Sequence, residues 1–232
     1  MMKNIDQTLE DLRNGKFVLV FDSDSREGET DFIKAAEFCE PSDIRQMRKE
    51  GGGLIILIVA NEFHTRFELP FLVDLYESST KTFPVLKNLY PSDIPYDTKS
   101  SFSLSLNHRK TFTGITDEDR SLTIKEFSNI SRESEGLEGE NARELFGKNF
   151  RTPGHVPVCS ASSKPLEDRF GHTEYGVALM KLADMTPVAC GCEMMGDNGK
   201  ALSKEEAEKY ANDHGLTFLK GTEITEAWRN RK

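Results

Sequence analysis

The sequence predicts an α/β (α+β) fold in which a mixed β-sheet is flanked by helices as a three-layer sandwich, with residues 1–232 forming a single domain. Three observations lead to this prediction. The chain has 232 residues, 37% of them hydrophobic, which is enough for a domain with a buried core. Helical and strand-like patterns alternate along the whole chain. No linker or internal repeat interrupts them, and helices layered over a sheet bury such a pattern well.

The first hundred residues predict a helix followed by two buried strands. Ile5, Leu9 and Leu12 recur at helical spacing, and a glycine after them marks the end of that helix. Apolar runs at 17–21 and 54–60 predict the strands. The other elements expected here are a short helix from Pro41 to the glycines at 51–53, and short elements and loops between 62 and 101, where four prolines fall.

The rest of the chain continues the alternation. Residues 101–107 alternate strictly between polar and apolar, which predicts a strand with one buried face. Ser203 and Glu206 form a capping-box pattern, so a helix is expected to begin there. The other expected elements are a helix over most of 117–131, an exposed acidic loop at 133–140, strands at 154–159, 186–190 and 216–219, an apolar helix from Thr173, and a last helix capped by Thr222.

Charge and composition argue against several classes of protein. The net charge is −9 without a stripe rich in lysine or arginine, so a nucleic-acid partner is not expected. No apolar run approaches the roughly 20 residues that cross a bilayer, and the first residues lack the apolar core of a signal peptide. We therefore expect no membrane partner and a cytoplasmic location. Paired Cys-x-x-Cys clusters are missing, so buried reduced thiols are expected rather than zinc ligands at Cys39, Cys159, Cys190 and Cys192.

An acidic stretch is the sharpest local signal. Ten residues hold five carboxylates and one arginine, in the order Asp22-Ser-Asp-Ser-Arg-Glu-Gly-Glu-Thr-Asp31. Carboxylates packed this closely repel one another, and a hard divalent cation with oxygen ligands would relieve that repulsion. A solvated acidic loop is the alternative. A calcium-binding EF-hand is excluded, because its sixth and twelfth positions require glycine and glutamate but are Glu27 and Ile33.

A second signal lies just before the apolar helix at 173. Helix N-termini attract anions, and Arg169 adds a planar charged group that suits phosphate. His172 could bind a metal or move a proton. Alternatively, Thr173 only caps the helix and His172 lies at the surface.

Three further positions carry polar groups suited to chemistry. Pro153 and Gly154 form a constrained turn that would aim His155, although a histidine in a turn is more often solvent-facing. Glu193 ends a predicted strand, where it could enter a site or remain a rim charge. The hydroxyl-rich run at 111–116 could hold a phosphate or simply cap a helix. Taken together, the signals fit metal-assisted enolisation of a phosphorylated sugar, in which a metal polarises a carbonyl and a base removes the adjacent proton.

Several motifs in order resemble one family. The acidic stretch, Arg151-Thr-Pro-Gly-His155, Gly171-His-Thr-Glu174 and Cys192-Glu-Met-Met-Gly-Asp197 closely resemble 3,4-dihydroxy-2-butanone 4-phosphate synthase of riboflavin biosynthesis, above all its single-domain archaeal form. The resemblance implies a lyase that converts D-ribulose 5-phosphate to L-3,4-dihydroxy-2-butanone 4-phosphate and formate. It also implies two Mg²⁺ ions, replaceable by Mn²⁺, and a homodimer with active sites at the subunit interface.

The resemblance further implies a set of site residues. Glu27 would bind both metals, and His172 would bind one of them. Contacts with the sugar phosphate would come from Arg26, Asp31, Arg169 and Thr173, with Thr113, Phe170 and Gly171 beside them. Catalysis would fall to His155 and Glu193. Ile56 departs from the family, since relatives often carry a cysteine there. The rival interpretations are another metal-dependent sugar-phosphate isomerase or aldolase, and a non-catalytic cation-binding protein.

Overall fold

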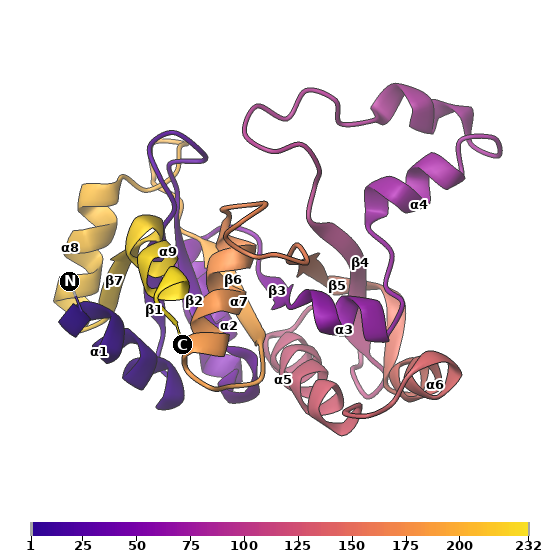
Figure 1. The fold of residues 1–232 in the computed structure, drawn as a ribbon, viewed down its shortest axis with the longest axis horizontal. Coiled ribbons are helices and arrows are strands. Elements are labelled where there is room, and N and C mark those ends of the chain that lie inside the picture. The colour runs from indigo at the N-terminus through magenta and orange to yellow at the C-terminus, as the bar shows by residue number, and fades with distance from the viewer. Residues whose placement is uncertain (1, 232) are drawn as a thin grey trace.

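A computed structural model describes residues 2–231 and contains one mixed sheet (Figure 1). Its strands follow the order β4-β5-β3-β6-β2-β1-β7. The pairs β1–β7 and β3–β5 are parallel, and the other neighbours are antiparallel. The strands are β1 (Val18–Phe21), β2 (Thr30–Ala35), β3 (Ile56–Val59), β4 (Phe102–His108), β5 (Phe150–Ser160), β6 (Val188–Glu193) and β7 (Thr217–Lys220).

Helices cover both faces of the sheet, so the predicted α/β three-layer fold is confirmed. One face packs against α1 (Met2–Arg13), α7 (His172–Leu182) and α9 (Gly221–Arg229). The other packs against α2 (Pro41–Gln46), α5 (Asp117–Glu133) and α8 (Lys204–His214). Two further helices, α3 (Asn61–Arg66) and α6 (Gly139–Asn149), lie near β4 and β5. The segment between α3 and β4 extends away from the sheet and carries α4 (Leu72–Ser78) and the 3₁₀ helix η3 (Pro84–Leu89) (Figure 1). The remaining short helices are η1 (Ala36–Phe38) and η2 (Met47–Gly51).

The central strands have apolar side chains on both faces because both faces are covered. Phe32 of β2 meets Tyr210 of α8 edge-on, with ring centroids 5.7 Å apart. Ile58 of β3 points to the opposite face, where it lies against Gly176 of α7 so closely that a Cβ at that glycine would sit 3.1 Å from it. This close contact sets α7 directly on the sheet, which fixes the position of the N-terminus of α7.

Most elements predicted from sequence are present, but some predictions were wrong. The acidic stretch continues directly into β2, an element the sequence analysis missed. The alternation at 101–107 becomes an irregular burial pattern, because register shifts interrupt the β4–β5 pairing. The expected loop at 133–140 is present but shorter, at 134–138, because α5 ends at Glu133 and α6 begins at Gly139. The last helix is capped by Lys220 rather than Thr222, which lies inside α9.

The remaining expectations concern the cysteines and membrane-spanning segments. The four cysteines are buried and free, as predicted. Within residues 2–231, no helix combines the length and apolar character that a membrane span requires.

Candidate active site

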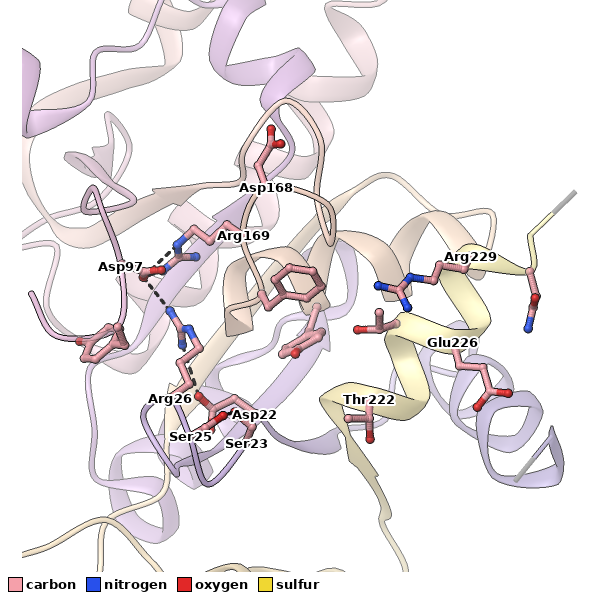
Figure 2. A pocket seen from close by; sticks show the side chains of 15 residues that line it. Asp22, Ser23, Ser25, Arg26, Asp97, Asp168, Arg169, Thr222, Glu226 and Arg229 are labelled. Atoms are coloured by element: carbon pink, nitrogen blue, oxygen red, sulfur yellow. Dashed lines mark hydrogen bonds and ion pairs between the residues drawn. The ribbon is translucent and has the colours of Figure 1, made fainter.

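Most of the residues singled out by sequence converge where β2 begins, β6 ends and α7 begins. A cavity of about 120 Å³ lies there. It is lined by Glu27, Asp31, Ile56, Ile94, Tyr96, Asp97, Ser100, Ser101, Phe102, Cys159, Arg169, His172, Thr173 and Glu193. Hereafter this is the inner cavity. An outer cavity of about 790 Å³ lies beside it and is lined in part by Asp22, Arg26, Phe170 and helix α9 (Figure 2).

Asp22 organises the acidic loop between β1 and β2. Its carboxylate accepts hydrogen bonds from the main-chain amides of Glu27 and Glu29, at 3.0 and 3.1 Å. It also accepts one from Arg26 Nη1 at 3.3 Å. The loop turns sharply at Gly28, whose φ of 69° is a conformation that side-chain-bearing residues rarely adopt. The loop is therefore an ordered turn around a buried carboxylate, and its geometry directs Glu27 inward.

Glu27 meets His172 at the first residue of α7. His172 Nδ1 lies 3.3 Å from Glu27 Oε2, and Nε2 lies 3.1 Å from the main-chain oxygen of Val20. One ligand atom each from Asp22, Glu27 and His172 falls within 4.8 Å of the others. Asp31 completes the cluster, with Oδ1 3.6 Å from His172 Nε2. The alternative that His172 lies at the surface is excluded, since it is buried.

The protonation of this cluster reflects crowded negative charge. Burial works against ionisation of Glu27, but the hydrogen bond with His172 and the charge of Arg26 outweigh it and lower its pKa to about 2. Burial also disfavours a charged His172, yet the surrounding carboxylates, led by Asp31, raise its pKa to about 9. Burial raises the pKa of Asp31 to about 8. The cluster thus holds more carboxylate than one imidazolium can balance.

These residues fit a divalent cation. Carboxylate oxygens and an imidazole nitrogen are ligands that Mg²⁺ and Mn²⁺ accept. Among the described residues, Asp31 Oδ1 is a buried oxygen without a hydrogen-bond partner, which a bound cation or its water would satisfy. Asp22 is already committed to the amides of its own loop. Glu27 and His172 therefore remain the pair best placed to bind a metal.

Two arginines lie beside the cluster and share one carboxylate. Arg26 Nη2 donates to Asp97 Oδ2 at 2.7 Å, and Arg169 donates to the same oxygen from Nη2 and Nε at 2.7 and 3.0 Å (Figure 2). Arg169 also pairs with Glu174. Glu174 is fully buried and accepts from the amide of Gly171 at 3.2 Å, which holds the arginine against the N-terminus of α7.

Glu193 reaches the inner cavity through strand register. Its Cα lies opposite that of Asp31 in the β2–β6 pairing, so both side chains leave the sheet on the same face. Its Oε2 accepts the main-chain amide of Leu54 at 2.7 Å. Gly53, the residue before Leu54, leaves room for this carboxylate. A Cβ added to Gly53 would lie 2.3 Å from Glu193 Oε2 and 2.7 Å from Glu193 Cβ.

The structure brings together most but not all of the predicted site residues. Glu27, Asp31, Arg169, His172, Thr173 and Glu193 line the inner cavity, and Arg26 and Phe170 line the outer one. Gly171 caps α7. Among the described residues, His155 and Thr113 line neither cavity. His155 donates its main-chain amide to Asn107 Oδ1 at 2.9 Å, and the exposed Thr113 hydroxyl lies 3.3 Å from Asp119.

Other residues of the inner cavity were missed by sequence reasoning. Tyr96 and Asp97 come from the proline-rich segment before β4, and Cys159 is the last residue but one of β5. Their local sequence carries no motif that points to a site. Ile56, the departure from the family pattern, also lines the inner cavity.

Comparison with known proteins confirms the family. The model of the family described as 3,4-dihydroxy-2-butanone 4-phosphate synthase matches residues 6–227. A synthase of that name from Methanothermobacter thermautotrophicus is 48% identical over 225 residues, covering 97% of this chain and 95% of that protein. Another from Methanosarcina mazei is 46% identical, covering 97% and 91%.

A solved structure supports the same conclusion. A 3,4-dihydroxy-2-butanone 4-phosphate synthase in complex with two magnesium ions is 25% identical, with a TM-score of 0.72 over 95% of this chain and 94% of its own. The chain therefore belongs to the 3,4-dihydroxy-2-butanone 4-phosphate synthase family, whose members are enzymes of riboflavin biosynthesis.

Proposed function

We propose that this enzyme converts D-ribulose 5-phosphate to L-3,4-dihydroxy-2-butanone 4-phosphate and formate. One observation supports the proposal above all: Glu27, His172 and Glu193 converge on one cavity. Arg169, which donates to Asp97, lines the same cavity. This arrangement combines a candidate metal pair, a carboxylate free for proton transfer and an anion-binding group. Membership of the family supports the same reaction.

We propose Mg²⁺ as the cofactor, replaceable by Mn²⁺, with two ions in each active site. Glu27 would hold both ions and His172 one of them. A relative that binds two magnesium ions supports this number. When bound, the metal polarises the sugar carbonyl and stabilises negative charge on neighbouring oxygens. His172 donates Nε2–H to the main-chain oxygen of Val20. Nδ1, which faces Glu27, is therefore the nitrogen that would bind a metal after releasing its proton, as in sites where a histidine ligand is held through its second nitrogen.

The phosphate end of the substrate would bind at the start of α7. Arg169 and Arg26 offer planar guanidinium groups that suit phosphate oxygens. Thr173 adds a hydroxyl, and Phe170 and Gly171 form the turn that leads into the N-terminus of α7, an end of a helix that favours anions. Asp31 faces the same cavity and would contact the sugar hydroxyls.

Glu193 and His155 would move protons. The family reaction requires enolisation, loss of water, a shift of the carbon skeleton and release of C4 as formate. Glu193 enters the cavity from the end of β6, anchored by the amide of Leu54, and would remove the proton from a carbon next to the carbonyl. His155 would exchange hydroxyl protons or assist the departing water.

We propose a homodimer in which the second subunit completes the site. His155 and Thr113 lie outside both cavities of their own chain, although the family motif assigns them to the site. Both project from the β4–β5 region. Phe112, next to Thr113, is 93% exposed, which is typical of an apolar side chain that another protein covers. We also propose a cytoplasmic location, since the four free thiols suit a reducing compartment.

Formate release tests the proposal. Purified protein is incubated with ribulose 5-phosphate and magnesium, and formate is measured with formate dehydrogenase. We expect formate that disappears with excess chelator. Isomerised sugar without formate would instead support a metal-dependent isomerase, and no conversion in folded, magnesium-loaded protein would overturn the proposal.

A further inference from the structure

Asp97 occupies the place where the two arginines would receive an anion. A single oxygen, Oδ2, accepts hydrogen bonds from both Arg26 and Arg169, within 3.0 Å of each (Figure 2). The Asp97 side chain is only 11% exposed, and the arginine side chains are 9% and 18% exposed. A partly buried carboxylate between two guanidinium groups makes strong, charge-assisted hydrogen bonds. The groups expected to bind phosphate are thus already paired within the chain.

The same residue separates the two cavities. Tyr96, Asp97 and Arg169 line both the inner and the outer cavity. The inner cavity holds the metal and proton-transfer groups, but its volume of about 120 Å³ is small. Pockets for small molecules usually measure roughly 300–1,000 Å³. To bind a sugar phosphate together with its metal ions, the inner cavity therefore has to widen, and this requires the residues that separate it from the outer cavity to move.

The segment that carries Asp97 is attached by few contacts. Within residues 90–101, all of which the structure describes, there is neither helix nor strand. Apart from Asp97, the charged contacts are a Tyr96 ring 5.0 Å from the Arg26 guanidinium, and two contacts of Lys99: an exposed ion pair with Asp74 and an approach of 4.4 Å to the Phe71 ring. Exposed ion pairs contribute little. The Asp97 contacts are consequently the main charged attachment of the segment to the site.

We propose that Asp97 is a latch that competes with the substrate's phosphate for Arg26 and Arg169, and that its displacement joins the inner and outer cavities. This inference rests on the proposed binding of a sugar phosphate. A phosphate dianion cannot share the two arginines with Asp97, because the like charges repel. Phosphate brings more charge and more acceptor oxygens than one carboxylate, so it displaces Asp97, whereas an unphosphorylated sugar does not. Asp97 thereby selects for phosphorylated substrates.

The latch makes a quantitative prediction for phosphate binding. A binding-competent state that is only a fraction of the population weakens the apparent affinity by that fraction. If the latch is closed in about nine-tenths of molecules, its removal strengthens binding about tenfold. Asp97→Asn keeps the size of the side chain and removes its charge. Asp97→Ser is a second variant, in which the side chain is also too short to contact the two arginines as the carboxylate does. Asp93→Asn is the matched control, an exposed carboxylate on the same segment.

The experiment measures inorganic phosphate binding by calorimetry in the wild-type protein and the three variants. We expect tighter binding in both Asp97 variants and wild-type affinity in Asp93→Asn. In turnover, Asp97→Asn is expected to lower KM for the sugar phosphate with little change in kcat. Weaker or unchanged phosphate binding in folded Asp97 variants would mean that Asp97 aligns the arginines or is inert, and would overturn the latch. Because phosphate binding needs no turnover, a failed formate assay would reject the proposed reaction without deciding this inference.

Discussion

His172 Nε2 lies 3.1 Å from the main-chain oxygen of Val20, on the strand that leads into the acidic loop. The contact orients the imidazole so that Nδ1 faces Glu27. The strand thus orients the histidine, and the loop that follows it supplies the carboxylate, so the candidate metal pair is already in place without an ion. Such preorganisation is typical of histidine ligands held through their second nitrogen.

Replacing His172 is expected to abolish tight metal binding. Removing even an outer partner of a ligand usually lowers metal affinity by roughly 10–100-fold, so loss of the ligand in His172→Gln is expected to cost at least that much. Titration with Mn²⁺, followed by electron paramagnetic resonance, measures the effect. His214→Gln, an exposed histidine on α8, is the control and is expected to bind as the wild type does. Wild-type affinity in His172→Gln would remove this residue from the metal site.

The absence of a side chain at residue 53 is expected to matter for turnover. A Cβ there would collide with Glu193, so Gly53→Ala is expected to displace that carboxylate. A misplacement of about 1 Å can cost roughly a hundredfold in rate. We therefore expect a large fall in kcat with less change in KM. Gly147→Ala is the control, because among the described residues no atom beyond the adjacent residues and the backbone of its own helix lies within 4 Å of the added Cβ. Unchanged kcat in Gly53→Ala would argue against Glu193 as the proton-transfer group.

The buried thiol of Cys192 predicts a loss of stability at alkaline pH. Burial raises its pKa from 9.0 to about 12. Below about pH 9 both folded and unfolded chains keep the proton. Between about 9 and 12 only the unfolded chain releases it, so the free energy of unfolding falls as pH rises, by up to about 1.4 kcal/mol per pH unit. Urea unfolding from pH 8.5 to 10.5 should show a steeper decline in the wild type than in Cys192→Ala, and parallel declines would contradict the assignment.

Mixing two inactive variants tests whether the active site is shared between two subunits, as we propose. Glu193→Gln and His155→Ala homodimers are each expected to be inactive, since every site lacks one group. In a mixed dimer, one site would receive both lesions and the other neither. Random exchange of subunits is therefore expected to restore about a quarter of wild-type activity. Activity that stays near zero after verified exchange would place His155 in the site of its own subunit, and an active His155→Ala homodimer would place it outside catalysis.

The sequence could predict the site where its residues lie close together along the chain. The acidic stretch and the residues before α7 carry their own motifs, and Glu27 and His172 meet as the resemblance implies. The placement of Glu193 opposite Asp31 depends on the β2–β6 register, and β2 itself was missed. Register emerges from packing of the whole sheet, which local patterns do not reveal.

The contacts of Asp97 could not be predicted from the sequence, for a different reason. Its contacts with Arg26 and Arg169 join residues 71 and 72 positions apart, through a segment without regular structure before β4. No periodicity or spacing links such residues. His155 and Thr113 lie outside the cavities of their own chain, and in the homodimer that we propose they would belong to the partner's site. Contacts between two chains leave no local pattern in the sequence of one.

The most direct test of the central claim follows the fate of one carbon atom. Ribulose 5-phosphate labelled with ¹³C at C4 is incubated with the magnesium-loaded protein, and the products are observed by ¹³C NMR. The account predicts labelled formate, which is lost with chelator and in Glu27→Gln but retained in Glu10→Gln, a carboxylate on α1. Formate without label, or labelled sugar that is only isomerised by folded protein, would contradict it.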